Sequence, residues 1–401
     1  MSVAKKMQAE NQKDFRWINL FNAIPLHKPQ CTMGIEEIDA IKKVFESGWL
    51  TLGPKTAEFE RVVSSFVGNK YGVGASSCTS ALYLALDSLN IKKGDFVVIP
   101  VNTFASTANV VRWIGAEPIF CDVGEDGEID VAELAGILET NEDVKCVVPV
   151  HLYGFPCNMK EISRLAKKYN IKMIEDCAQA LGATFGGKRV GGFGDAGCFS
   201  FYATKNISTG EGGMLVTNSK KVQNRGFLVR NHGQTKTPNQ KRSNWRYDIS
   251  DLGFNFRMSE IEAAIGLKQM EKIGFITESR RDLARKYQVA LEEIEGIKML
   301  HDPGNNLHQS VFQLLEVKVE KPYPLTRNKL FSYLQKRGIT TGVHYIPLHY
   351  FSYYKKTTKY KKGDFPNAEK LYSRILSLPM FPFMTEQEFQ AIIGALKGTA
   401  V

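Results

Sequence analysis

The feature that most constrains the fold is a regular alternation of short apolar segments and helical patterns between residues 73 and 217. The apolar segments are nearly continuous, as expected of strands buried on both faces of a parallel sheet. The predicted strands cover residues 73–75, 96–100, 118–122, 145–150, 172–176, 198–201 and 214–217. Helices between most of them indicate a seven-stranded, mainly parallel sheet. The last two strands are too close for a crossover helix, so one of them is predicted to run antiparallel.

The length of the chain predicts two domains of unequal size. With 401 residues, 43% of them hydrophobic, the chain can bury one large core and one smaller core. We expect residues 1–22 to form a polar extension, residues 23–272 a large α/β domain and residues 273–401 a small α+β domain. In the small domain, residues 311–319 alternate like a half-exposed strand, and residues 342–346 are expected to be extended.

Two helices are predicted around the domain boundary. Ser259 and Glu262 have the spacing of a capping box, and the apolar pattern of the helix that they begin runs to Met270. A second, charged segment, residues 277–293, is predicted to be a separate helix that leads into the small domain.

A carboxylate and a lysine follow two of the predicted strands. Asp176 stands at the carboxyl end of one strand, where open α/β sheets bind their ligands. Lys205 comes a few residues after the strand at 198–201. Pyridoxal phosphate requires such a pair, a lysine for a Schiff base and an acid for the pyridinium nitrogen. The alternative is structural, since an Asp at this place often caps a helix and a loop Lys is often a solvated charge.

Two segments are candidates for phosphate binding. Residues 76–81 (SSCTSA) lie between a strand and a helix start, where backbone amides and hydroxyls could hold a phosphate. Simple capping by Thr79 or Ser80 uses the same donors and stays open. Residues 192–197 match G-x-G-x-x-G, but a strand and not a helix follows them. We therefore interpret these glycines as tight turns.

The net charge of +10 raises the question of nucleic-acid binding. Residues 353–362 alternate lysines with tyrosines, a pattern that can bind nucleic acid. A solvated surface is the simpler interpretation, and a basic surface also suits a small polyanion such as a nucleotide diphosphate. We therefore expect no nucleic-acid partner.

The cysteines, histidines and apolar segments argue against metal, disulfide and membrane roles. The seven cysteines include no C-x-x-C pair, and no histidine spacing predicts a metal site. No run of 18 apolar residues is present, and the first residues lack the apolar core of a signal peptide. We expect a cytoplasmic protein without membrane attachment.

Six motifs carry a resemblance to a known family. They are CTSAL at 78–82, NTFASTAN at 102–109, EDCAQ at 175–179, SFYATK at 200–205, GFNFRM at 253–258 and VHYIPLH at 343–349. In this order they resemble the DegT/DnrJ/StrS family of sugar aminotransferases, from about Pro25 to near the C-terminus. The resemblance implies the aspartate aminotransferase type of fold, pyridoxal 5'-phosphate as cofactor, and a homodimer.

The resemblance also implies roles for single residues around the cofactor ring. Lys205 would bind the cofactor and move the proton. Asp176 would keep the pyridine nitrogen protonated. Phe104 would stack on the ring, and Gln179 would lie near the ring hydroxyl or the opposite face.

Other residues are assigned to the phosphate and the sugar by the same resemblance. Thr79, Ser80 and Ser200 would hold the phosphate, and Asn255 would reach the phosphate of the neighbouring subunit's cofactor. His344 and Tyr345 would lie near the sugar, although a histidine and an aromatic residue in an extended segment are as often part of a core.

The function implied is a two-step transamination. Glutamate, or else glutamine, would donate the amino group to the keto carbon of a nucleotide-linked 4-keto-6-deoxy sugar. Residues 207–213 (ISTGEGG) resemble the version found in enzymes that aminate C4. Amination at C3 and dehydration at C3 are alternatives on the same fold, although the dehydrating branch has histidine in place of Lys205. A non-catalytic sugar-nucleotide-binding protein is a further alternative.

Overall fold

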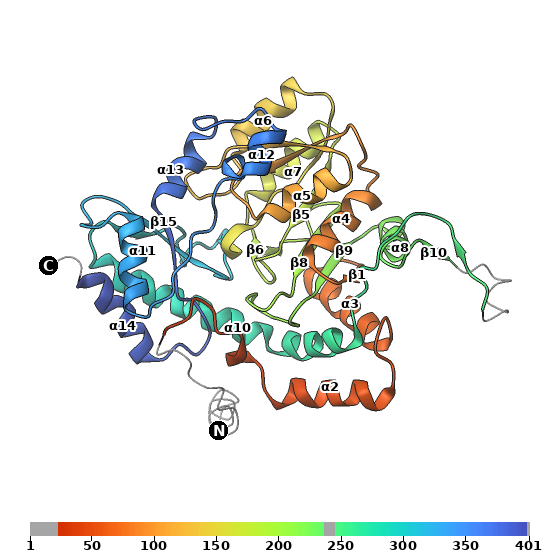
Figure 1. Cartoon of the computed structure of the whole chain (residues 1–401), viewed down its shortest axis with the longest axis horizontal. Coiled ribbons are helices and arrows are strands. Elements are labelled where there is room, and N and C mark those ends of the chain that lie inside the picture. The colour runs from red at the N-terminus through yellow and green to blue at the C-terminus, as the bar shows by residue number, and fades with distance from the viewer. Residues whose placement is uncertain (1–22, 236–244, 399–401) are drawn as a thin grey trace.

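One large sheet organises the N-terminal two thirds of the protein (Figure 1). The computed structural model describes residues 23–235 and 245–398, so the extension predicted at 1–22 lies outside the described residues. The strands of this sheet are β1 (Tyr71–Ala75), β2 (Phe96–Pro100), β3 (Glu117–Cys121), β4 (Val144–Val147), β5 (Lys172–Asp176), β8 (Ala196–Ser200) and β9 (Gly213–Thr217).

The order of the strands confirms the predicted architecture. They lie in the order β1-β9-β8-β5-β4-β2-β3. Strand β9 is antiparallel to both β1 and β8, and every other neighbouring pair is parallel. The mainly parallel sheet of seven strands, with one antiparallel member, is therefore confirmed.

Helices cover both faces of this sheet because successive strand residues point to opposite sides. In β2, Val97 and Ile99 belong to the core on one face and Val98 to the core on the other. The first face is covered by α4 (Cys78–Ser88), α5 (Ala105–Trp113) and α8 (Lys220–Val229). The second face is covered by α3 (Pro54–Val67), α6 (Val131–Thr140), α7 (Met159–Lys168) and the first half of α10 (Glu260–Glu292).

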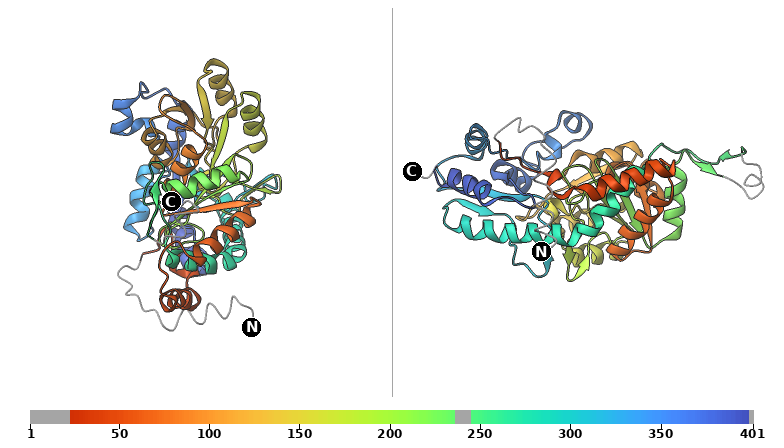
Figure 2. Two further views of the ribbon diagram at one scale, coloured as in Figure 1. Left: turned by 90° about the vertical axis from the view of Figure 1, so that its right-hand side faces the viewer. Right: turned by 90° about the horizontal axis from the view of Figure 1, so that it is seen from below.

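Helix α10 connects the two parts of the protein. It has 33 residues and runs from the large sheet into the C-terminal part (Figures 1 and 2). The predicted capping box begins it, since the Ser259 hydroxyl accepts a hydrogen bond from the Glu262 amide and the Glu262 carboxylate accepts one from the Ser259 amide. The right-hand view of Figure 2 shows the short ribbon of β10 (Gln234–Thr235) and β11 (Asp248–Ile249) extending away from the body.

The prediction of two separate helices in this region is wrong. The segment between Met270 and Thr277 is helical as well, because Ile273 and Ile276 are buried in the core under the large sheet and continue the apolar stripe. The boundary predicted between residues 272 and 273 falls inside this continuous helix.

A smaller antiparallel sheet forms the centre of the C-terminal part. Its strands are β12 (Ile297–Met299), β14 (Leu315–Val319) and β15 (Ile375–Leu378), in that order. The second half of α10, α11 (Arg327–Lys336) and α14 (Glu386–Lys397) pack on it and enclose a second core. The predicted combination of a large α/β part and a smaller α+β part is therefore present in the structure.

One strand prediction in this part needs correction. The strand predicted at 311–319 begins only at Leu315, because Phe312 has a positive φ of 44° and residues 313–314 form a bend. In the segment 342–346, which was expected to be extended, only Gly342 forms a bridge, with Ser377 of β15.

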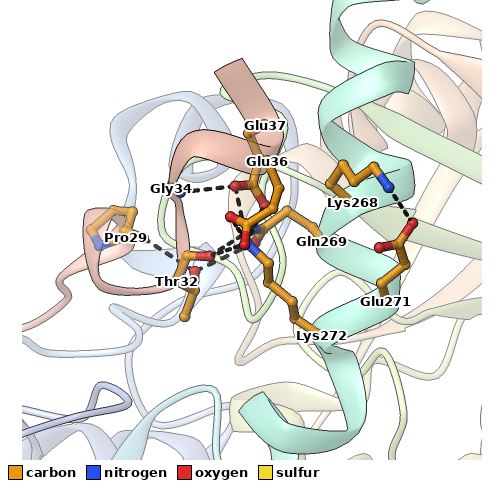
Figure 3. A network of polar contacts seen from close by, with 9 residues as sticks. All are labelled: Pro29, Thr32, Gly34, Glu36, Glu37, Lys268, Gln269, Glu271 and Lys272. Atoms are coloured by element: carbon orange, nitrogen blue, oxygen red, sulfur yellow. Dashed lines mark hydrogen bonds and ion pairs between the residues drawn. The ribbon is translucent and has the colours of Figure 1, made fainter. Parts of the chain in front are cut away.

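A buried polar network holds helix α2 (Ile35–Ser47) against α10 (Figure 3). The Glu37 carboxylate accepts hydrogen bonds from the Gln269 amide at 2.8 Å and from Lys272 Nζ at 2.7 Å. Its other oxygen accepts from the Gly34 amide, which begins the helix, at 2.8 Å. Because Glu37 is buried, these bonds replace its water shell.

Replacing Lys272 by methionine should destabilise the protein by about 3–5 kcal/mol, because it leaves the buried Glu37 carboxylate without its cation. Lys268, one turn earlier on α10, pairs with Glu271 on the surface, so Lys268→Met is the matched control with an expected cost below about 1 kcal/mol. Urea unfolding of both variants measures the difference. Equal costs would show that the network does not stabilise the fold.

No helix within residues 23–235 and 245–398 is both long and apolar enough to cross a membrane.

Candidate active site

Asp176 lies at the carboxyl end of β5, at the centre of the large sheet. Its Oδ2 accepts a hydrogen bond from Thr107 Oγ1 at 2.8 Å, and its Oδ1 accepts one from the Ala178 amide at 3.1 Å. Burial raises the pKa of this carboxyl group, although both hydrogen bonds and the charge of Lys205 oppose the change. Within the described part of the chain Asp176 forms no ion pair. The site thus holds a buried acid that lacks a cation in direct contact.

Lys205 lies in the loop between β8 and β9. Its amide donates to the Tyr202 carbonyl at 2.9 Å, and the Gln313 side chain donates to the Thr204 carbonyl at 3.0 Å and fixes the loop against the C-terminal part. Burial lowers the pKa of the Lys205 amine, opposed by Cys78 and Asp176. No residue in 23–235 or 245–398 forms a hydrogen bond with Nζ. A desolvated amine of this kind loses its proton at a lower pH than a surface lysine, so more of it is neutral and available as a nucleophile and proton acceptor.

The start of helix α4 lies beside these two residues. Its N-cap is Ser77, whose hydroxyl accepts from the Ser80 amide at 3.1 Å, so the suggestion that Thr79 or Ser80 caps the helix is wrong. The amides of the first helical residues have no intrahelical acceptor, and they form the positive end of the helix dipole. In the part of the chain that the structure describes, nothing bonds the Thr79 hydroxyl. This edge can therefore accept a phosphate.

Close backbone packing brings Ser200 to the same edge. Ser200 is paired with Gly213 across β8 and β9, and Gly212 forms a bridge with Ser77. A Cβ atom on Gly213 would overlap the backbone of Ser77. The cradle around Ser77, Thr79 and Ser200 therefore depends on a position without a side chain.

Gly213→Ala should disturb this cradle. We expect a destabilisation of about 1–3 kcal/mol and at least about a tenfold weaker affinity for pyridoxal phosphate, since the backbone of Ser77 must move. Gly136, in the middle of α6, has open space around it, so Gly136→Ala should be neutral or slightly stabilising. Cofactor titration and thermal unfolding measure both effects. If Gly213→Ala binds pyridoxal phosphate as tightly as the wild type, Ser77 is not part of the cofactor site.

Phe104, Gln179 and Tyr345 meet on another side of the site. Phe104 is 58% exposed, and the centroid of its ring lies 5.8 Å from that of Tyr345. The Gln179 amide donates to the Tyr345 hydroxyl at 3.0 Å, and the Gln179 carbonyl accepts from the Tyr153 amide at 2.6 Å. An exposed aromatic face and a fixed carboxamide at the rim of the site suit a planar ring.

His344 lies next to Tyr345 and is mostly buried. Its Nδ1 is 2.6 Å from Ser377 Oγ. Burial, and to a smaller extent the charge of Lys205, lowers the pKa of His344 to about 4, so the ring is neutral at physiological pH. The effect of Lys205 shows that the two side chains lie within electrostatic reach of each other.

Asn255 has an exposed side chain that bonds to nothing in the described part of the chain. Its backbone bridges Asn231, and the neighbouring Phe256 carbonyl accepts from the Ser76 amide at 2.9 Å. Asn255 is thus close in sequence to a residue that contacts the start of α4. Its role toward a neighbouring subunit stays a prediction.

Sequence reasoning assigned no role to three residues that hold the site together. Thr107 orients Asp176, and Asn102 accepts from the Tyr345 amide at 3.2 Å and donates to the Tyr153 hydroxyl at 3.0 Å. Thr107 and Asn102 both lie in the NTFASTAN motif, which gave a signal for them. Tyr153 has a positive φ of 61°, which no sequence pattern indicated.

One further cluster looks like a metal site and is better explained as structure. Ligand atoms of His151, Glu175 and Cys177 lie within 4.8 Å of one another. However, His151 Nδ1 accepts from the Cys157 amide, so its proton is on Nε2, which contacts Glu175. The Glu175 carboxylate also accepts from three backbone amides of the 191–194 turn. Neither residue keeps a free lone pair well placed for a metal.

The residues fit pyridoxal phosphate. A buried acid without a cation suits a pyridinium nitrogen, an unpaired amine suits the cofactor's carbonyl carbon, and a helix N-terminus suits its phosphate. This arrangement, at the carboxyl edge of a mainly parallel sheet joined to a small α+β part, defines the class of transferases that use pyridoxal phosphate and have the aspartate aminotransferase type of fold.

Comparison with known proteins identifies the family. A sequence model of the DegT/DnrJ/EryC1/StrS aminotransferase family matches residues 32–397. The spore coat polysaccharide biosynthesis protein SpsC of Bacillus subtilis is 38% identical over 372 residues, which cover 91% of this chain and 94% of SpsC. The chain belongs to the DegT/DnrJ/EryC1/StrS family and is a sugar aminotransferase that depends on pyridoxal phosphate.

Solved structures agree. Helicobacter pylori PseC, an aminotransferase involved in the biosynthesis of pseudoaminic acid, is 28% identical and superimposes with a TM-score of 0.87, covering 94% of this chain and 99% of PseC. The putative sugar aminotransferase Spr1654 of Streptococcus pneumoniae, in its pyridoxamine phosphate form, is 28% identical with a TM-score of 0.87, covering 95% and 99% of the two chains. Its pyridoxal phosphate form is similar to this chain as well.

Proposed function

We propose that the protein transfers an amino group from glutamate to C4 of a nucleotide-linked 4-keto-6-deoxy sugar, as a step in the synthesis of a glycan. The observation that carries the proposal is the desolvated, unpaired Lys205 amine within electrostatic reach of the buried Asp176. The preference for C4 is supported by residues 207–213, which follow Lys205 and resemble those of C4 enzymes. A glycan product is supported by SpsC and PseC, whose names refer to a spore coat polysaccharide and to pseudoaminic acid.

Each residue has a physical task in this reaction. When bound, pyridoxal phosphate supplies a carbonyl carbon that combines with amines and a ring that withdraws electrons. Lys205 accepts the proton from the donor amino acid and returns it in the second half of the cycle, because its lowered pKa allows both states. Asp176 holds a proton at the ring nitrogen. Thr79 and Ser200 hold the phosphate, and Phe104 covers the ring.

The basic surface suits the nucleotide diphosphate of the substrate better than nucleic acid. In the segment 353–362, Tyr354 is buried and donates to Asn109 at 2.7 Å, and Tyr360 stacks on Phe120 with ring centroids 5.1 Å apart. These two aromatic rings therefore serve the core and are not available to stack on bases. The lysines between them remain as a source of positive charge for the substrate's phosphates.

We also propose that the working unit is a homodimer with shared sites. Four large apolar side chains are exposed in the segments just before Asn255 and beside the start of α10: Trp49, Leu50, Leu252 and Phe254. The first two lie beside the start of α10, since the Glu260 amide donates to the Leu50 carbonyl at 3.0 Å. An exposed apolar patch of this kind, next to a residue assigned to the neighbouring cofactor, suits an isologous interface.

Mixing two defective variants tests the shared site. In a dimer of one Lys205→Ala subunit and one Asn255→Ala subunit, one site has lost both residues and the other has lost neither. Subunit exchange should therefore restore activity above that of either variant alone at limiting cofactor. No restoration, in a mixture shown by mass spectrometry to contain the mixed dimer, would place Asn255 in its own subunit's site or outside the site.

The reaction itself is tested with glutamate and a panel of 4-keto-6-deoxy and 3-keto-6-deoxy sugars linked to uridine, thymidine or guanosine diphosphate. The proposal predicts 2-oxoglutarate and a 4-amino sugar, identified by mass and by NMR. A 3-amino sugar from a 3-keto substrate would support the C3 alternative. A product that has lost the C3 hydroxyl group and gained no amine would indicate a dehydratase. If glutamine and not glutamate supports the reaction, only the amino donor of the proposal changes.

A cytoplasmic location is part of the proposal. All seven cysteines are free thiols, as expected in a reducing compartment.

A further inference from the structure

A chain of three polar side chains connects the interior of the C-terminal part to the active site. Glu316 of β14 lies directly opposite Ser377 of β15 in the antiparallel pairing, and Ser377 Oγ is 2.6 Å from Glu316 Oε1. The same Oγ is 2.6 Å from His344 Nδ1. Glu316 and Ser377 are buried, whereas 20% of the His344 side chain is exposed. The chain therefore leads from the core to a group that a ligand can reach.

The hydroxyl of Ser377 has one proton, so it can donate only one of these two short hydrogen bonds. The other bond must be donated to Ser377. In one arrangement Glu316 is a protonated acid that donates to Ser377, Ser377 donates to His344 Nδ1, and the ring proton of His344 is on Nε2. In the other, Ser377 donates to the Glu316 carboxylate, and His344 donates from Nδ1.

Burial favours the first arrangement at neutral pH. It raises the pKa of Glu316 to about 8, even though the hydrogen bond with Ser377 opposes the rise. Glu316 Oε2 is buried and has no partner within the described residues, which a neutral acid tolerates better than a carboxylate. Because the pKa of His344 is lowered to about 4, the ring does not take this proton.

Other titratable groups around Glu316 do not change this balance. The hydroxyls of Tyr153 and Tyr345, in neighbouring segments, lie within electrostatic reach of Glu316. Burial raises the pKa of both, so they stay neutral. Lys318 is on the same face of β14, two residues further along, and is half-buried. Its amine forms no part of the hydrogen-bonded chain from Glu316 to His344.

We propose that Glu316, acting through Ser377, decides which ring nitrogen of His344 carries the proton, and so presents His344 Nε2 to the substrate as a hydrogen-bond donor. No hydrogen bond links Nε2 to any residue in 23–235 or 245–398. When Glu316 releases its proton to solvent, Ser377 turns its proton to the carboxylate and the single ring proton moves from Nε2 to Nδ1. The ring stays neutral, but Nε2 becomes an acceptor. Glu316 is thus a positioning residue.

The identity of the group that meets Nε2 rests on the proposed function. For a keto sugar it is an oxygen atom that needs a donor, either the ketone or a neighbouring hydroxyl group. The donor form is available below about pH 8 and is lost as the pH rises through the pKa of Glu316.

Gly342 keeps the His344 ring in register with Ser377. A Cβ atom on Gly342 would lie 2.6 Å from His344 Cε1 and 3.2 Å from Nδ1, and Gly342 exchanges two backbone hydrogen bonds with Ser377. Gly342→Ala should therefore push the ring away and break the contact between His344 and Ser377.

Nitrogen NMR of the holoenzyme labelled with ¹⁵N-histidine tests the inference without substrate. The signals of His344 are assigned from their loss in His344→Gln. In the wild type we expect the proton on Nε2 at pH 6, and an exchange of the two nitrogen shifts as the pH rises through about 8. Glu316→Gln and Ser377→Ala should both abolish this exchange. Glu128→Gln, which removes another buried acid of raised pKa at Cys157, should leave it unchanged.

Two results would overturn the inference, namely a proton on Nδ1 at pH 6 and a wild-type spectrum that does not change between pH 6 and 9. Both are read from the wild-type spectrum, so the test does not depend on whether Glu316→Gln or Ser377→Ala folds. The kinetic counterpart is a fall above pH 8 in the rate constant for amination of the keto sugar. In Glu316→Gln this rate constant should not fall above pH 8. If no keto sugar is aminated while the shifts still exchange, the proposed function fails and the inference stands.

Discussion

Lys205→Ala should lower turnover by about 10⁴-fold or more while the fold is retained. The variant removes the one amine that burial keeps desolvated and unpaired beside Asp176, and with it both the covalent link to the cofactor and the proton carrier. The measurement is the rate of 2-oxoglutarate formation from glutamate, with circular dichroism as the check on folding.

Two further variants separate charge from chemistry. Lys205→Arg keeps a positive charge but cannot lose its proton, so it should be as inactive as Lys205→Ala. Lys160→Ala removes an exposed lysine at the start of α7 and should retain wild-type activity. A Lys205→Ala enzyme that turned over at the wild-type rate would defeat the assignment of the site.

The second large effect is expected for Asp176→Asn. The amide has the same shape and can still accept from Thr107, but it is neutral and cannot keep a ring nitrogen protonated. Turnover should fall by about 10²–10⁴-fold. Thr107→Val removes a single hydrogen bond to the carboxylate and should cost about tenfold.

Although Asp176→Asn lowers turnover, it should not lower the stability of the cofactor-free protein. Burial raises the pKa of Asp176 above its value in the unfolded chain. The cofactor-free fold therefore loses stability as the pH rises from the unfolded pKa through the folded pKa and the carboxylate ionises. Asp176→Asn removes this cost, and the thermal midpoint of the cofactor-free protein at pH 7 should stay equal or rise. A variant that loses less than about threefold in turnover would show that Asp176 does not serve the ring.

The large sheet could be predicted because its strands are buried on both faces. The run 96–100 is continuously apolar, and residues 171–174 are mostly apolar and lead into Glu175 and Asp176, which places Asp176 at the carboxyl edge without any knowledge of the fold. The short loop between the last two strands predicted that one of them runs antiparallel, and in the structure this strand is β9.

The predictions of helix boundaries and caps were wrong where contacts between distant segments determine the local structure. The segment between Met270 and Thr277 is helical because its apolar residues meet the core of the large sheet, which the local charge pattern does not show. Ser77 caps α4 in preference to Thr79 because its backbone is extended beside Gly212.

The site was predictable in its motifs but not in its long-range contacts. Thr107 could be read from the same motif as Phe104. The contact of Gln179 with Tyr345 joins residues 166 positions apart, and that of Glu316 with Ser377 depends on the register of two distant strands. Local patterns carry no information on such pairings.

The most direct test of the central claim is the visible absorption spectrum of the purified protein with pyridoxal phosphate, before and after addition of glutamate. The account predicts a yellow absorption band that bleaches with glutamate and is absent in Lys205→Ala. A wild-type protein that shows no band would contradict the assignment of Lys205 and Asp176 to a cofactor site, and would favour a protein that binds sugar nucleotides without catalysis.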